Sequence, residues 1–196
     1  TRPGGNLTGV NSMTTELGAK RLGLLHELLP RAMRFGVLVN SSVPGAESII
    51  AASQAATATM GQPLEVLTAN TIQAIDAAFS LAVEKRVDAL MVSNAQLFST
   101  RRVQLITHTV RHAIPTIFFD RSFAEVGGLM TYNASMTDQH RQVGIYVGRI
   151  LKGEKPADLP VLQPTRFEFV INLQTARLLG IDVPPALLAI ADAVIE

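Results

Sequence analysis

The sequence predicts an α/β protein in which helices flank a parallel β-sheet, and two features of its pattern support this. Short apolar runs rich in β-branched residues alternate with longer segments of helical period, which is typical of βαβ units. The runs are apolar at successive positions, as expected for strands that helices cover on both faces. The composition agrees, because 47% hydrophobic and 17% charged residues suffice for a buried core in a chain of 196 residues.

The first predicted element is a leucine-rich helix whose apolar residues run from Leu17 to Leu29, with Pro30 near its end. Its leucines fall broadly on one side, and Ser12 or Thr14 is expected to cap its beginning. Lys20 and Arg21 are expected to face water.

Strands and helices then alternate. The strands are bounded by turn residues, and the helical segments are rich in Ala, Leu and Ile. In order, the predicted strands are 35–40, 64–67, 89–93 and 116–119, and the predicted helices are 46–60, 72–85 and 99–112. Asn70 or Thr71 is expected to cap the second of these helices. This regularity predicts one α/β lobe.

The pattern changes after residue 120. Ser135 is the first residue of a possible capping box, and Asn172 is expected to begin a later helix. Three prolines predict an extended connector over residues 152–164. In order, we predict a loop over 123–128, a strand over 129–132, a helix over 139–151, an extended connector over 152–164, a strand over 167–171, and helices over 172–180 and 184–195.

Several segments match one protein family in the same order along the chain. They are residues 2–9 (RPGGNLTG), 20–22 (KRL), 28–30 (LLP), 127–132 (GGLMTY), 151–160 (LKGEKPADLP) and 167–172 (FEFVIN). Together they strongly resemble ABC-transporter substrate-binding proteins of the tryptophan/tyrosine type. The resemblance implies a periplasmic-binding-protein-like fold I, in which two α/β lobes are joined by three crossing strands.

The resemblance also implies a division of the chain. Residues 1–126 would form the second lobe with its first crossing segment, 127–164 a crossing strand, helix and connector that belong with the first lobe, and 165–196 the return to the second lobe. The first lobe is expected to be missing here, so the architecture would be an incomplete two-lobe one. The apolar helix 139–151 would then lack its sheet, and we expect it to pack on a second copy of the chain as a homodimer.

Polar residues follow the predicted strands, where open parallel sheets bind ligands. Short amides and hydroxyls can hydrogen-bond a carboxylate or an ammonium group, and an acid can pair with a cation. A tyrosine at a crossing strand can stack on a ligand. The ligand-binding candidates are Asn40, Ser41, Ser42, Asn94, Gln96, Asp120, Arg121 and Tyr132.

Each candidate also has a purely structural interpretation. Asn and Ser at strand ends commonly cap the next helix. Asp120 and Arg121 can form a surface ion pair, and Tyr132 can pack within a hinge. The convergence of several polar residues, rather than any one of them, indicates a binding site.

The sequence gives no argument for catalysis, a metal or a cofactor, and we predict none of them. It has no cysteine, nucleophile elbow, P-loop or dinucleotide-binding glycine motif. His108 and His112 have the spacing of a metal-binding pair on a helix, but no glutamate completes the HExxH pattern. A net charge of +1 without a basic block argues against nucleic acid, and the apolar runs are too short for membrane insertion.

The resemblance therefore implies the solute-binding component of an ABC importer. Such a protein would capture a small organic solute between two lobes and deliver it to the transporter's permease. The solute would be an amino acid or a related carboxylate, with an aromatic one as an option. The full-length protein would be periplasmic or extracytoplasmic, although no signal peptide is visible. Two alternatives stay open: a ligand-sensing regulatory domain of the same fold and a small Rossmann-like enzyme.

Overall fold

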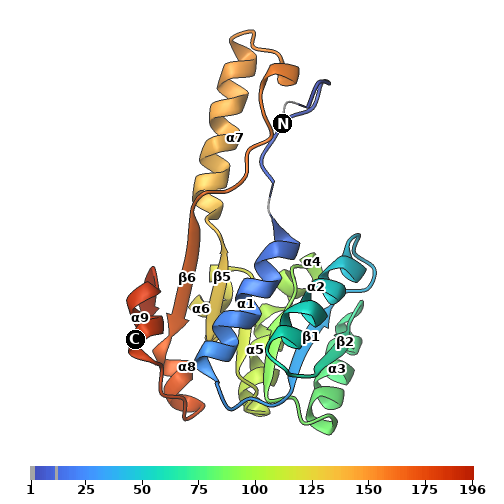
Figure 1. Cartoon of the computed structure of the whole chain (residues 1–196), viewed down its shortest axis with the longest axis vertical. Coiled ribbons are helices and arrows are strands. Elements are labelled where there is room, and N and C mark those ends of the chain that lie inside the picture. The colour runs from blue at the N-terminus through green and yellow to red at the C-terminus, as the bar shows by residue number, and fades with distance from the viewer. Residues whose placement is uncertain (1–2, 12) are drawn as a thin grey trace. The chain divides into compact units, whose positions relative to one another are not determined.

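The computed structural model describes residues 3–11 and 13–196 (Figure 1). The chain folds into two compact units. The larger unit, here called the α/β lobe, comprises Thr14–Asn133 and Phe169–Glu196. The smaller, here called the α7 unit, comprises Ala134–Glu168 and the segment that ends at Met13. The chain therefore passes between the two units at three points along its length.

The described residues form a mostly parallel sheet of seven strands in the order β2-β1-β3-β4-β5-β6-β7. The strands are β1 (Phe35–Val39), β2 (Leu64–Thr68), β3 (Ala89–Val92), β4 (Thr116–Phe118), β5 (Met130–Ala134), β6 (Phe167–Asn172) and β7 (Ala193–Ile195). Strands β1 to β5 run parallel. Strand β6 is antiparallel to β5, because the Asn172 N–H donates to the Leu129 carbonyl while the Ser135 N–H donates to that of Arg166. Strand β7 is parallel to β6.

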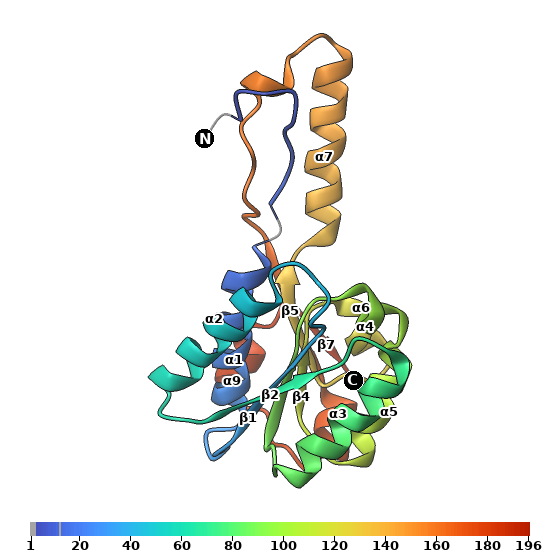
Figure 2. The ribbon, with the colours of Figure 1, turned by 90° about the vertical axis from the view of Figure 1, so that its right-hand side faces the viewer.

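Helices cover both faces of the sheet (Figure 2), which confirms the predicted α/β fold. Strand β1 shows the division, since all of its residues are buried. Phe35, Val37 and Val39 join the core beneath α1, α2, α8 and α9, whereas Leu38 joins the core beneath α3 to α6. The helices are α1 (Thr14–Leu28), α2 (Ala46–Thr59), α3 (Ile72–Glu84), α4 (Gln96–Thr100), α5 (Arg102–Arg111), α6 (Arg121–Glu125), α7 (Met136–Leu151), α8 (Leu173–Leu178) and α9 (Pro185–Ile190).

The predicted capping chemistry is confirmed at three helices. Thr71, Ser135 and Asn172 each accept a hydrogen bond from the backbone N–H three residues later. Ser135 forms only half of a capping box, because its own N–H donates to the Arg166 carbonyl. The proposed cap Ser12 of α1 lies outside the described residues.

Two predictions near the middle of the chain are wrong in detail. The helix expected over 99–112 is two helices, α4 and α5, which meet at Arg101. The loop expected over 123–128 contains the end of α6, because Asp120 caps a helical turn there. Both differences involve short helices, α4 and α6, which have too few apolar positions to give a periodic signal.

The C-terminal prediction is also wrong in part. The helix expected over 184–195 ends at Ile190, and β7 follows it. Asp192 separates the two elements: its Oδ2 accepts the Phe169 N–H at 2.8 Å, and its own N–H donates to the Phe169 carbonyl at 2.8 Å. These bonds align the last residues with β6. Residues 193–195 are extended because they pair with β6, and their own sequence is too short to specify a strand.

The α7 unit is held together by the connector that follows α7. Thr8 Oγ1 donates to the Leu159 carbonyl at 2.8 Å, and Val10 forms a bridge with Leu162. The Tyr146 hydroxyl on α7 donates to the Pro160 carbonyl at 2.7 Å. The connector is therefore fixed both to the opening segment and to the helix.

Candidate functional site

The carboxyl ends of β1, β3, β4 and β5 lie along one edge of the sheet, because these strands are parallel neighbours. The segments that follow β1, β3 and β4 begin with Asn40, Ser93 and Phe119-Asp120. Hydrogen bonding ties the first two segments together, since the Ser93 N–H donates to the Leu38 carbonyl at 2.9 Å. We call this the carboxyl edge of the lobe. Ligands of open parallel sheets bind at such an edge.

The residues after β1 form a tight turn. Asn40 is half-buried, and its Oδ1 accepts the Ser42 N–H at 2.9 Å. Ser41 and Ser42 are exposed. The amide oxygen of Asn40 is therefore engaged in the turn, and its amide NH₂ is the group with which it could bind a ligand.

The segment after β3 contains a residue outside the predicted set. Asn94 and Gln96 are exposed, and Gln96 is the first residue of α4. Ser93 is 2% exposed, and its Oγ has no hydrogen-bond partner in the described part of the chain. An enclosed hydroxyl without a partner is rare in folded proteins, which makes Ser93 a further candidate. Its sequence signal is a polar residue directly after a fully apolar strand.

Asp120 and Arg121 make the local contacts that a structural role requires. Asp120 Oδ1 accepts hydrogen bonds from the backbone N–H and the hydroxyl of Ser122, and so caps α6. Arg121 Nε lies 2.9 Å from Glu125 Oε1, with both side chains about half exposed. These contacts use one oxygen of Asp120 and part of the Arg121 guanidinium. Ligand binding by either residue stays a prediction.

Tyr132 lies near the carboxyl end of β5 and is half-buried. Its ring packs edge-on against Phe169, with the ring centres 6.3 Å apart. Burial raises the pKa of Tyr132, the negative charge of Asp192 raises it further, and the positive charge of Arg21 lowers it. The charges of Asp192 and Arg21 therefore act on the phenol in opposite directions.

Arg21 is buried, so the prediction that it faces water is wrong, whereas Lys20 beside it is exposed. Its Nε donates to the Tyr132 carbonyl at 2.7 Å, and its Nη2 lies 3.4 Å from Asn133 Oδ1. Burial lowers the pKa of Arg21 to about 10. The sequence did not predict that Arg21 is buried, because charged side chains are rarely fully buried and are therefore assigned to the exposed side of a helix. Only the position of β5 beside α1 reveals its partners.

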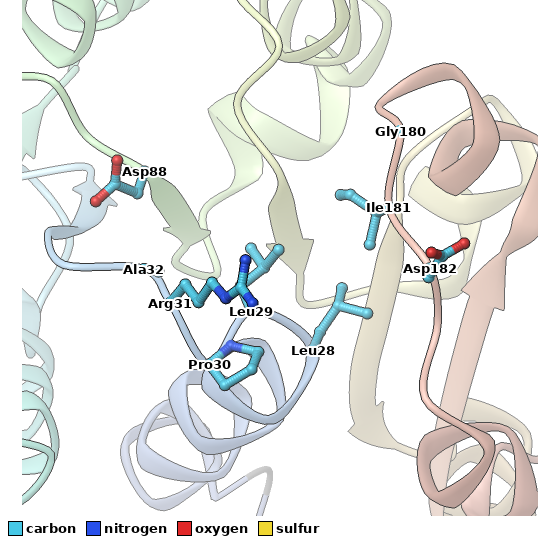
Figure 3. Close-up of a pocket in the computed structure, with 9 residues that line it drawn as sticks. All are labelled: Leu28, Leu29, Pro30, Arg31, Ala32, Asp88, Gly180, Ile181 and Asp182. Atoms are coloured by element: carbon cyan, nitrogen blue, oxygen red, sulfur yellow. The ribbon is translucent and has the colours of Figure 1, made fainter.

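The α/β lobe also has hollows away from the carboxyl edge. One of about 520 Å³ lies at the amino ends of β1 and β3 and is lined by Leu28–Ala32, Asp88 and Gly180–Asp182 (Figure 3). Asp88 Oδ2 is already engaged there by the N–H groups of Met33 and Arg34. None of the predicted ligand-binding residues lines this hollow.

A second hollow of the lobe, between α3 and α5, is lined by His108 and His112, the two histidines with the spacing of a metal-binding pair. The rings of His108 and His112 stack with their centres 5.8 Å apart, and His108 Nε2 lies 2.7 Å from Asp76 Oδ1. No cluster of three or more His, Cys, Asp or Glu in the described part of the chain is arranged to hold a metal ion. No described helix is long and apolar enough to cross a membrane.

The sequence model of the family described as ABC transporter substrate binding protein matches residues 1–195. The chain belongs to this family. The resemblance seen in the sequence motifs is thereby confirmed, and the family is a solute-binding one rather than a class of enzymes. No curated protein sequence matches the chain.

Two solved structures show how much of a substrate-binding protein the chain spans. The ABC domain from Streptococcus pneumonia in complex with L-Trp is 26% identical over 99% of this chain and 66% of its own length, with a TM-score of 0.87. A conserved domain protein from Vibrio cholerae O1 biovar El Tor is 25% identical over 98% of this chain and 64% of its own, with a TM-score of 0.89. The chain thus spans about two thirds of these relatives.

More distant structures agree in fold alone. A periplasmic solute binding protein from Actinobacillus succinogenes with bound D-allose is 13% identical over 88% of this chain and 63% of its own, with a TM-score of 0.64. Relatives of this fold therefore hold ligands as different as an amino acid and a sugar.

Proposed function

We propose that the α/β lobe binds a small organic solute at its carboxyl edge and that the protein delivers this solute to the permease of an ABC importer. The observation that carries the proposal is the convergence of polar groups from neighbouring strand ends in a member of this family. Asn40, Ser93 and Asp120 come from three adjacent strands. Asn40 and Asp120 are half-buried and can hydrogen-bond groups of one ligand, whereas the Ser93 hydroxyl is enclosed and would need a local rearrangement to reach it.

An amino acid or a related carboxylate is the proposed solute. The complex of the S. pneumonia relative with L-Trp supports this, because that protein matches nearly the whole chain. The relative with D-allose is too distant to support a sugar in the same way. Tyr132 would offer its ring to the side chain of the solute, and Asp120 would offer its carboxylate to the ammonium group.

We propose that the lobe supplies one wall of the binding site. The part of the solved relatives that this chain does not span would supply the other wall, and the segment 127–164 would belong with that part. Ligand contacts made only in the closed form would stabilise closure. The protein would act in the periplasm or another extracytoplasmic space, where importers collect their solutes.

We further propose that a second copy of the chain covers the apolar side of α7. Val143, Val147 and Leu151 follow one another at every fourth position, so they share one side of α7, and they are between 44% and 82% exposed. Native mass spectrometry should therefore show a dimer, and Val147→Asp should convert it to a monomer with unchanged circular dichroism. A monomeric wild-type chain would contradict the homodimer.

Isothermal titration with L-tryptophan tests the proposed function. Asp120→Asn keeps the oxygen that caps α6 but removes the charge, so it should weaken binding by about tenfold without unfolding the lobe. Asp182→Asn removes an exposed carboxylate at the opposite edge and should leave binding unchanged. Equal affinity of wild type and Asp120→Asn would contradict the role of Asp120. Absence of binding to wild type would contradict L-tryptophan as the solute.

A further inference from the structure

Arg21 has an unusual environment for a charged residue. Its side chain is enclosed by the lobe, with 2% of its surface exposed. With a pKa of about 10, the guanidinium is still charged at neutral pH. Enclosing a cation destabilises a fold unless a negative group compensates the charge. A negative group must therefore compensate this charge, or the charge destabilises the fold.

The described part of the chain shows no acid that compensates this charge. Among residues 3–11 and 13–196, no Asp or Glu forms an ion pair with Arg21, and its two hydrogen-bond acceptors are a backbone carbonyl and an amide. The acids near the carboxyl edge have other donors: Asp192 accepts the Phe169 N–H, and Asp120 caps α6.

The position of this charge connects it to the candidate site. Both acceptors, the Tyr132 carbonyl and Asn133 Oδ1, belong to the carboxyl end of β5. Strand β5 is parallel to β4, so this end belongs to the same edge as Asp120. We propose that Arg21 is a positioning residue of the binding site, and that its uncompensated charge makes the carboxyl edge favour a ligand with a carboxylate over an uncharged analogue.

This inference rests on the proposed function and adds the residue that selects the ligand's charge. Arg21 acts through its field and by holding the end of β5, because its guanidinium is enclosed rather than open to solvent. Charges in a partly desolvated environment interact more strongly than charges in water. A ligand carboxylate at the edge would supply the missing negative charge.

Tyr132 reports on this field without any ligand. The charge of Arg21 lowers the pKa of Tyr132, while burial and Asp192 raise it. The chain has two tyrosines, so Tyr146→Phe leaves Tyr132 as the sole phenol in an ultraviolet titration. In that background Arg21→Met should raise the pKa of Tyr132, whereas Arg21→Lys and the exposed Lys20→Met should leave it close to wild type. An unchanged value in folded Arg21→Met would overturn the inference.

A second variant protects this test against misfolding. Arg21→Gln also removes the charge but keeps an N–H donor for the Tyr132 carbonyl. If Arg21→Met does not fold, Arg21→Gln is titrated in the same background. A raised pKa of Tyr132 would then support the inference, and an unchanged pKa would overturn it.

Ligand selectivity gives the second readout. Isothermal titration compares L-tryptophan with L-tryptophanamide, which differ only in the carboxylate. Wild type and Lys20→Met should favour the acid by about tenfold, and Arg21→Met should bring this ratio close to one. The same ratio in wild type and Arg21→Met would overturn the inference. If wild type binds neither probe, the proposed function fails for L-tryptophan, and the tyrosine titration decides the inference alone.

Discussion

Helices α1 and α7 both carry many apolar side chains, but only those of α1 are covered. Leu22 and Leu25 of α1 are fully buried, whereas Val147 and Leu151 of α7 are 50% and 82% exposed. Helix α1 packs on the core of the α/β lobe. Among the described residues of α7, Tyr146 alone is buried, and its hydroxyl contacts the connector that follows the helix. An apolar helix is therefore buried only where another apolar surface is available, and its own sequence does not provide one.

The largest expected effect separates the two helices directly. Leu25→Ala in α1 should lower the free energy of unfolding by about 2–5 kcal/mol, because it leaves a cavity in a packed core. Val147→Ala in α7 should change it by less than about 0.5 kcal/mol, because the side chain is half exposed. Urea denaturation at low protein concentration measures both. Equal losses would mean that a partner covers α7 even in dilute solution.

Removing a helix cap should have a smaller effect on stability, and it again compares the α/β lobe with the α7 unit. Thr71→Ala and Ser135→Ala each remove a side-chain acceptor for a helix N–H and should cost about 1 kcal/mol. Thr71 caps α3 of the lobe, so its loss should lower the midpoint of global unfolding. Ser135 caps α7, and its loss should speed amide exchange in the first turn of that helix. Exchange in α7 that stays as slow as in wild type would contradict this.

The smallest effect concerns pH. Hydrogen bonds from Gln104 and then from His108 lower the pKa of Asp76 in the folded lobe. A lowered pKa means that ionised Asp76 stabilises the fold above its unfolded pKa of about 4, and that this stabilisation is lost as the pH falls through the folded value. Asp76→Asn should therefore reduce the melting temperature slightly at neutral pH and have no effect in strong acid.

Glu154 provides the matched control for the pH effect. Its pKa is also lowered, by a hydrogen bond from Arg149, but it lies in the α7 unit. Glu154→Gln should leave the pH dependence of the lobe's unfolding unchanged. A similar change in both variants would assign the effect to overall charge rather than to the contacts of Asp76.

The regular part of the fold was predictable from local patterns. Strand β1 is apolar at successive positions, and Thr71 lies where a helix cap is needed, so both could be placed without tertiary information. The short helix α6 and strand β7 could not, because one depends on the Asp120 cap and the other on pairing with β6. Short elements carry too few residues for a periodic signal.

The candidate site shows the same limit. Asn40 and Asp120 were predictable as polar residues at strand ends, since parallel strands present their carboxyl ends at one edge. The unpartnered hydroxyl of Ser93 depends on what surrounds it, and only the fold reveals those neighbours.

The sequence by itself determined the α/β class, the family and the strand ends that carry polar residues, because these depend on residue order and on local periodicity. Only the tertiary structure decided that Arg21 is buried while Lys20 is exposed, and that α1 is covered while α7 presents apolar side chains. The physical reason is that burial and charge compensation are properties of neighbours in space. A helix sequence specifies its own faces, and the fold specifies what meets them.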